Sequence, residues 1–353
     1  MHWMKEDLLS TNARSLPEWK KMQNNRDYLF DNYKVFLIFL VVVGHFIGPS
    51  VGCNEFLRIF KWIIVSFHMP AFIFISGYFS KRNLPILTII QRLAVPYLAY
   101  EIIYFLWYTF VTHKETSLAL LKPKFTLWYL LALFMWRIIT PYVKKIPYHM
   151  FLAILAGILI GFSNMEDNFL TIPRAVVYFP FYLAGTSFDR ELLTKWRKSR
   201  KTTVLAILFI LMIALALAFA GLQRIAPMQV FYGRYNYVSM KQGVTEGVLW
   251  RILLYIIGFL MTFSFMTLMP EKKLAFSYIG TRTMAIYLFH GLTYTYLEQC
   301  TKLLNNINNI FGTILLLILC SLVTWFFSLK PFTSFTNLFS NIPILSNKKG
   351  TAS

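Results

Sequence analysis

Residues 207–221 read ILFILMIALALAFAG, a run without a single charged or strongly polar side chain. With the residues just before it, this run is long enough to cross a hydrocarbon layer ~30 Å thick, which takes about 20 apolar residues in a helix. A water-soluble helix would keep one polar face, and this run has none. The run therefore predicts a membrane-spanning helix.

Apolar segments of similar character recur along the chain on both sides of this run. Only 14% of the 353 residues are charged, against about 25% in soluble proteins, so the chain cannot cover its surface with polar groups. We predict an all-α integral membrane protein, a bundle of about ten transmembrane helices. The expected spans are 33–49, 56–79, 86–111, 125–143, 148–163, 171–188, 202–221, 247–269, 274–297 and 307–330.

The positive charge of the chain predicts its orientation in the membrane. Lys and Arg total 35 against 15 Asp and Glu, and cytoplasmic loops collect Lys and Arg. A cytoplasmic N-terminus places most of these cations in successive inner segments, and ten spans return the C-terminus to the same side. We expect a cytoplasmic tail at 1–32, one ten-span domain at 33–330 and a second cytoplasmic tail at 331–353. The charge then has an explanation without nucleic acid, and no nucleic-acid partner is expected.

Several classes of active site have no support in the sequence. The three cysteines, Cys53, Cys300 and Cys320, form neither a disulfide framework nor a metal-ligand cluster, and we expect no metal. Phosphate-loop, dinucleotide-binding and nucleophile-elbow motifs are absent. Acid–base chemistry by histidine remains open, because an imidazole titrates near neutral pH.

Ionisable side chains inside the predicted spans are the first candidates for function, because such groups are costly in a membrane. Arg137 and Arg251 have long stems that let them extend to an interface. Buried, hydrogen-bonded packing is the alternative for the others, but several in one small bundle favour a functional site. The remaining candidates are His45, His68, Glu101 and His290.

The first span, 31–49, carries two of these features on one face. Lys34 and His45 are eleven residues apart, so in a helix they point in nearly the same direction, ~16 Å apart along the axis. One face then presents a cation at the cytoplasmic mouth and an imidazole beyond the middle of the bilayer. Lys34 alone would be an ordinary anchor at the membrane interface. Because it lies on the same helix face as His45, a role in a functional site is favoured.

The second and third spans add cations to the same mouth. His68 lies near the middle of the second span beside Pro70, which frees backbone carbonyls and suits a polar cavity. That span ends on Lys81 and Arg82, and Arg92 opens the third. These cations either hold a phosphorylated ligand through charge-assisted hydrogen bonds or follow only the positive-inside rule.

Six blocks of sequence, in order, resemble one known family, the acyltransferase-3 family of integral-membrane acyltransferases, and specifically its fucose 4-O-acetylase-like branch. GHF followed by FHMPAFIFISGYF is a specific combination. The blocks are RDYLFDNYKVFLIFLVVVGHF (26–46), FHMPAFIFISGYFSKR (67–82), RLAVPY (92–97), LWYLLALFMWR (127–137), PFYLAG (180–185) and TMAIYLFHG (283–291).

The resemblance implies transfer of an acyl group, usually acetyl, from cytoplasmic acetyl-CoA to a hydroxyl of a surface glycan or its lipid-linked precursor. The family's basic residue, ten others and a histidine fall on Lys34 and His45, although many relatives have arginine first. The family's arginine before the third span's proline matches Arg92. A bacterial cytoplasmic membrane is the expected location.

These arguments together give the expected site. Lys34, Arg82 and Arg92 bind the phosphates of acetyl-CoA, and His45, with Lys34, is catalytic as general base on the acceptor. An acetyl-histidine relay is the alternative mechanism. His68 or Glu101 orients the imidazole or binds the sugar, and Trp128 stacks on a sugar ring. The 222–246 loop, with Arg224, Tyr232 and Arg234, either covers the acceptor site or forms an interfacial aromatic belt.

Other classes of protein compete with this interpretation. A transporter of a small polar solute would also need buried ionisable groups and a polar path, but it would not consume acetyl-CoA. A membrane anchor or sensor would carry a soluble domain, which the sequence does not show.

Overall fold

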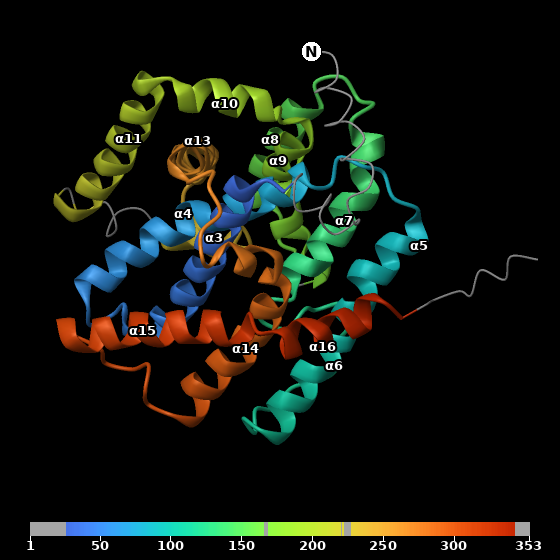
Figure 1. Ribbon diagram of the computed structural model, residues 1–353, viewed down its shortest axis with the longest axis vertical. Coiled ribbons are helices and arrows are strands. Elements are labelled where there is room, and N and C mark those ends of the chain that lie inside the picture. The colour runs from blue at the N-terminus through green and yellow to red at the C-terminus, as the bar shows by residue number, and fades with distance from the viewer. Residues whose placement is uncertain (1–25, 166–168, 220, 222–226, 343–353) are drawn as a thin grey trace, which may run out of the picture.

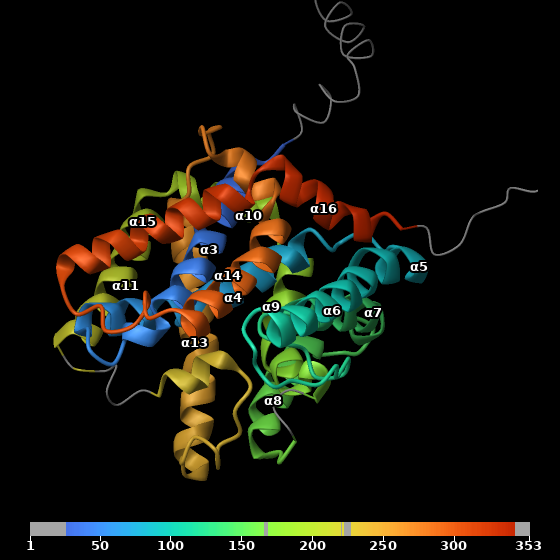
Figure 2. The ribbon, with the colours of Figure 1, turned by 90° about the horizontal axis from the view of Figure 1, so that it is seen from below.

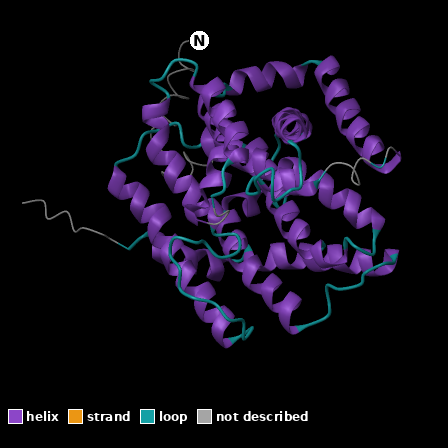
Figure 3. Cartoon of the chain, turned by 180° about the vertical axis from the view of Figure 1, so that it is seen from behind, coloured by secondary structure: helices purple, strands orange, loops and turns teal. Residues whose placement is uncertain are grey.

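The computed structural model describes residues 26–165, 169–219, 221 and 227–342. Helices and loops account for all of these residues, without a strand (Figure 3). The all-α prediction is therefore confirmed for this part of the chain.

Each of the ten predicted spans overlaps a helical stretch of similar length. Shorter helices lie between them: α10 (Arg190–Lys198), η1 (Gly48–Ser50), η4 (Phe169–Thr171), η5 (Met228–Tyr232) and η6 (Ser277–Thr281). Another short helix, α16 (Lys330–Ser340), follows the last of these stretches. The long stretches are α3 (Tyr28–Phe46), α4 (Glu55–Tyr78), α5–η2–α6 (Ile86–Phe110), α7 (Trp128–Val143), α8–η3 (His149–Phe162), α9 (Ile172–Ser187), α11 (Arg200–Phe219), α13 (Val244–Leu268), α14 (Thr283–Cys300) and α15 (Ile310–Phe327).

Six of these stretches are long and apolar enough to cross a membrane, counted over the described residues. They are α3, α4, α5–α6, α11, α13 and α15. The chain is thus a multi-pass membrane protein. The count of ten spans and the cytoplasmic location of both termini stay predictions.

The helices divide into a central one and peripheral ones. In α3, 67% of the most apolar window is buried inside the protein, and α3 packs against α4, α14 and α15. In α11 the buried share is only 17%, and α11 lies at the edge of the molecule beyond α13 (Figure 1). Because α11 is strongly apolar but exposed, its surface suits lipid rather than water.

Two glycines let α4 and α9 approach to backbone contact. A Cβ on Gly77 would lie 2.1 Å from the carbonyl oxygen of Tyr182, and one on Gly185 would lie 1.9 Å from that of Phe74. Neither distance is sterically possible, so small residues are required at this crossing, as is common between membrane helices. This close contact fixes how α4 and α9 present their side chains to the interior.

The ends of the domain differ from the expected tails. Helix α3 already begins at Tyr28, inside the predicted N-terminal tail, of which residues 1–25 lie outside the described residues. In the predicted C-terminal tail, α16 packs against α6 and α14, beyond the end of α15 (Figure 2); residues 343–353 lie outside the described residues.

The ninth predicted span begins later than expected. Its first residues form turns and η6 instead of helix, and α14 starts at Thr283. The reason is a tertiary contact: the Ser277 hydroxyl donates to Asn32 of α3 and accepts a hydrogen bond from the backbone N–H of Leu274. These bonds favour a turn over a continuous helix.

Candidate functional site

A cavity of about 330 Å³ collects three of the predicted site residues. His45 comes from the C-terminal end of α3, His68 from the middle of α4, and Trp128 from the first turn of α7. We call this space the histidine cavity. Its lining comes from α3, α4, α7, α9 and α14 and from the segments before α7 and α13, which brings together residues more than a hundred positions apart in the sequence.

In the part of the chain that the structure describes, His68 and His290 are each hydrogen-bonded to their own helix, and His45 is not. The Nδ1 atoms of His68 and His290 lie 2.7 Å and 3.0 Å from the carbonyl oxygens of Ile64 and Ile286. A carbonyl only accepts, so each Nδ1 carries the proton and each Nε2 is left as an acceptor in the neutral ring. His45 has no such bond to its own helix among the described residues, and its ring centroid lies 5.4 Å from that of His290.

Phe125 packs directly on His45, and both of its neighbours in the chain are tethered. The ring centroids of Phe125 and His45 are 4.7 Å apart, and Phe125 adopts a left-handed backbone with φ 46°. Such a conformation persists only where surrounding contacts hold it. Here the side chain of Lys124 pairs with Glu101, and the carbonyl of Thr126 accepts a hydrogen bond from Tyr287.

Glu101 is placed away from the histidine cavity. Its carboxylate is fully buried, lies 3.2 Å from the ammonium of Lys124 and also accepts from the backbone N–H of that residue. It does not line the histidine cavity. The contacts therefore favour a role in holding the connection between α6 and α7, in place of the sugar binding that the sequence suggested.

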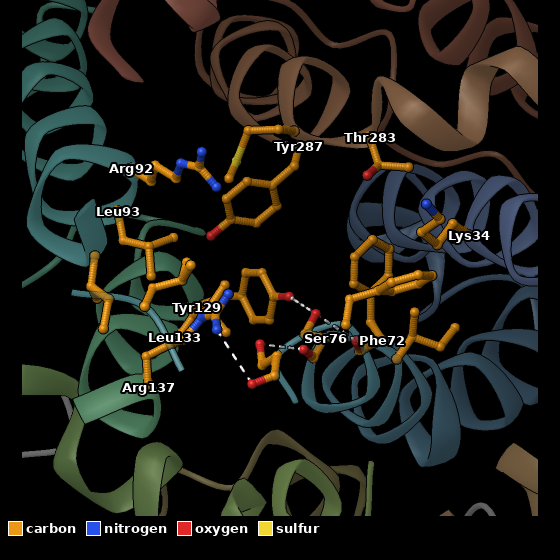
Figure 4. Close-up of a pocket in the computed structure, with 16 residues that line it drawn as sticks. Lys34, Phe72, Ser76, Arg92, Leu93, Tyr129, Leu133, Arg137, Thr283 and Tyr287 are labelled. Carbon is orange, nitrogen blue, oxygen red and sulfur yellow. Dashed lines mark hydrogen bonds between the residues drawn. The ribbon is translucent and has the colours of Figure 1, made fainter. Parts of the chain in front are cut away.

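A second cavity, of about 280 Å³, is lined by the start of α3, the second half of α4, η2, α7 and the start of α14. Lys34 from the start of α3, Arg92 from η2 and Arg137 from α7 contribute its cations, with Lys34 and Arg92 on opposite sides (Figure 4). We call it the basic cavity. The ammonium of Lys34 lies 2.9 Å from the carboxylate of Asp31, so part of its charge is neutralised within α3.

Arg82 lines a third cavity, of about 650 Å³, that adjoins the basic cavity. The two cavities share Ser80, Leu84, Ile89 and Arg137. The third one adds Lys81, Lys144 and Lys145 to the cations on this side of the protein. The prediction that Lys34, Arg82 and Arg92 surround a single mouth is therefore refined: Lys34 and Arg92 share one cavity, and Arg82 lies in the next.

The loop before α13 closes the histidine cavity. Tyr232, Arg234 and Tyr235 line it, which favours the interpretation of this loop as a cover over the site; Arg224 lies outside the described residues. Arg251, which we expected to reach an interface, is instead buried and donates to the carbonyl of Tyr235 from 3.1 Å. That expectation was wrong, because the guanidinium is enclosed by the protein, and the cover loop supplies an acceptor for one of its nitrogens.

Sequence reasoning missed several members of the site. Lys61 and Arg174 line the histidine cavity, and the guanidinium of Arg174 lies 4.9 Å from the centroid of the Trp128 ring. Both positions fall inside predicted spans, so the rule that flagged His45 would have found them. Tyr287 and Phe125 carry no comparable signal, since aromatic side chains are ordinary in membrane helices.

The sequence comparisons identify the family of the chain. A family model described as an acyltransferase domain, of the acyltransferase-3 family, matches residues 27–329. No curated protein and no solved structure matches the chain. The match covers both cavities and favours group transfer over the alternative of a transporter without chemistry. The chain therefore belongs to the acyltransferase-3 family and is a membrane acyltransferase.

Proposed function

We propose that this acyltransferase moves an acetyl group from cytoplasmic acetyl-CoA to a hydroxyl of a cell-surface carbohydrate or its lipid-linked precursor, in a bacterial cytoplasmic membrane. The observation that supports this most is the pair of cavities at the two ends of α3, where Lys34 lines one cavity and His45 the other. Both cavities contain cations, but only the second contains histidines, and the first adjoins the third cavity with its further cations.

The donor binds in the basic cavity and its neighbour. The phosphates of acetyl-CoA carry several negative charges, and guanidinium groups bind phosphate oxygens through paired hydrogen bonds. Arg82 in the third cavity and Arg92 in the basic cavity are suited to this task. Lys34 lies at the entrance of the route toward His45, with its charge shared with Asp31. The thin pantetheine arm fits a cavity of the observed volume better than the nucleotide does.

The acceptor binds in the histidine cavity. Trp128 and the tyrosines of the cover loop offer ring faces for a sugar, and His68 offers its Nε2 as a hydrogen-bond acceptor for a hydroxyl. His45 removes the proton from the reacting hydroxyl as its oxygen attacks the thioester carbonyl. The carbon–sulfur bond then breaks, and the departing CoA thiolate takes the proton from His45. The acetyl-histidine relay stays the alternative route.

General-base catalysis of this kind contributes about 10²–10⁴-fold to a rate. We expect His45→Ala to lower O-acetylation by that factor without lowering the amount of protein in the membrane. The measurement is proton NMR of purified surface glycans, in which O-acetyl methyl groups give separate signals. The strains are a deletion and the deletion carrying wild type, His45→Ala or His149→Ala at equal membrane levels. His149 lies at the start of α8 and lines neither cavity.

The outcomes separate the parts of this proposal. Loss of the signal on deletion, restored by wild type and His149→Ala but not by His45→Ala, supports both the carbohydrate acceptor and the role of His45. Full restoration by His45→Ala overturns the general base. An unchanged glycan on deletion overturns the carbohydrate acceptor.

A further inference from the structure

One aromatic side chain, that of Tyr287, belongs to the walls of both cavities. It is buried in the second turn of α14, and the lining residues of the histidine cavity and of the basic cavity have Tyr287 in common. In Figure 4 its ring lies above that of Tyr129, between Arg92 and Lys34. The two cavities therefore meet at this ring.

Two further rings extend the wall across the bundle. The centroid of Tyr129, on α7, lies 5.6 Å from that of Tyr287, and the centroid of Phe72, on α4, lies 6.0 Å from that of Tyr129. Each pair is edge-to-face, which is a favourable packing geometry for aromatic rings. Phe72 and Tyr129 face the basic cavity. Met69 and Trp128, their near neighbours in the chain, face the histidine cavity.

Hydrogen bonds fix two of the three rings in place. The Tyr287 hydroxyl donates to the carbonyl of Thr126, and the Tyr129 hydroxyl is hydrogen-bonded to the side chain of Ser76. Both partners are uncharged; Ser76 lines the basic cavity and Thr126 lines the histidine cavity. A rotation of Tyr287, the ring that lines both cavities, would break one hydrogen bond and join the two spaces while Tyr129 stays in place.

We propose that Tyr287, supported by Tyr129 and Phe72, is a partition between a donor side and an acceptor side, and that it turns aside for the acyl group to reach His45. Because Lys34 and His45 lie near opposite ends of the apolar helix α3, we infer that the two cavities open toward opposite faces of the membrane, and a permanent connection between them would conduct water and ions. A closed aromatic wall prevents that leak. The identities of donor and acceptor rest on the proposed function, whereas the partition rests on the two cavities alone.

The partition can be tested by thiol labelling, without any acyl transfer. In a background with Cys53, Cys300 and Cys320 replaced, Met69→Cys reports on the histidine cavity and Met284→Cys on the basic cavity. The probe is a membrane-impermeant methanethiosulfonate that carries a sulfonate, applied to right-side-out and to inside-out membrane vesicles. The rate of thiol loss is measured for each reporter from each face.

We expect the two reporters to react from opposite faces, whichever way the protein is oriented. Adding Tyr287→Ala should raise the wrong-face rate of both reporters at least tenfold, and Tyr287→Phe, which keeps the ring but loses its hydrogen bond, should raise it less. Phe72→Ala provides a second opening if Tyr287→Ala does not accumulate. Phe289→Ala is the matched control, because its ring leaves the same helix toward α15 and α16.

Other results contradict the partition. Reaction of either parent reporter from both faces, or from neither, overturns it, and so does an unchanged wrong-face rate in Tyr287→Ala and in Phe72→Ala. A failure of the proposed function would look different: the labelling pattern would be as expected, but wild-type vesicles would consume no acetyl-CoA.

Discussion

At the residue scale, His45 is distinguished by what its ring does not contact. His68 and His290 each donate from Nδ1 to the carbonyl four residues earlier, which fixes their tautomers. No such bond holds His45 among the described residues, so both of its ring nitrogens are open to partners outside its own helix. The nearest imidazole is that of His290, whose Nε2 is buried and has no hydrogen-bond partner in the described part of the chain.

This geometry predicts a positioning role for His290. An acceptor at Nε2 of His290 would orient the N–H of His45, directly or through one water, and leave the other nitrogen of His45 as the base. We expect His290→Ala to lower kcat at least tenfold with little change in the KM for acetyl-CoA. His290→Gln, which can supply a carbonyl oxygen, should recover part of the loss.

The measurement is the rate of CoA release in membrane vesicles that carry the native acceptor, with acetyl-CoA varied. Thermal unfolding in detergent serves as the control for a packing defect. Equal losses in the Ala and Gln variants, or a rise in KM alone, would count against the positioning role.

At the scale of elements, the connection between α6 and α7 links the interior of the protein to the site. It places Phe125 against His45, and its anchor is the buried pair of Glu101 and Lys124. Removing one partner of a buried ion pair leaves an uncompensated charge and costs about 3–5 kcal/mol. The same connection also carries Thr126, the partner of Tyr287, so stability and site geometry depend on one segment.

Glu101→Gln should therefore lower the free energy of unfolding by about 3–5 kcal/mol and reduce activity through a displaced Phe125. The matched control is Glu115→Gln, an exposed carboxylate in the same connection. Thermal unfolding of the detergent-solubilised proteins measures the difference in stability. Equal melting temperatures for Glu101→Gln and wild type would show that the pair contributes no net stability, and the anchor would then have to be sought elsewhere.

At the scale of the whole molecule, the cavities differ in two ways: the basic cavity adjoins a third cavity with further cations, and the histidine cavity combines its cations with His45 and His68. Cations from four separate segments line the basic cavity and its neighbour. The positive-inside rule places such a cluster of cations in the cytoplasm, where acetyl-CoA is found. The arrangement therefore predicts that the reaction has a direction across the membrane.

Sealed vesicles test that direction, because acetyl-CoA does not cross a bilayer. Inside-out vesicles should release CoA from added acetyl-CoA, and right-side-out vesicles should do so only after permeabilisation. Equal release by both kinds of sealed vesicle would argue against a cytoplasmic donor site.

Arg92→Ala should raise the KM for acetyl-CoA about ten- to hundredfold, because it loses a charge-assisted hydrogen bond worth about 1.5–3 kcal/mol. The control is Lys302→Ala, which removes an exposed cation just after the C-terminal end of α14 and should leave the KM unchanged.

Local sequence determined the helices, the membrane environment and the family of this protein. Hydropathy acts over one segment at a time, so runs such as 207–221 report a span without any knowledge of its neighbours. The sequence also predicted that Lys34 and His45 lie on one face of a helix, because the number of residues per helical turn is fixed. The quoted blocks were enough to indicate the acyltransferase-3 family, which the family match then showed.

Only the tertiary structure decided which of these residues meet. Lys34 and His45 lie on one helix but line different cavities, because the ring of Tyr287 from α14 comes between the two spaces. Glu101 looked like a site residue until its pairing with Lys124 was seen, and Tyr287 looked like ordinary packing. The physical reason is that hydropathy and helical period describe a single helix, whereas a cavity is made where the faces of several helices, distant in sequence, fail to fill the space between them.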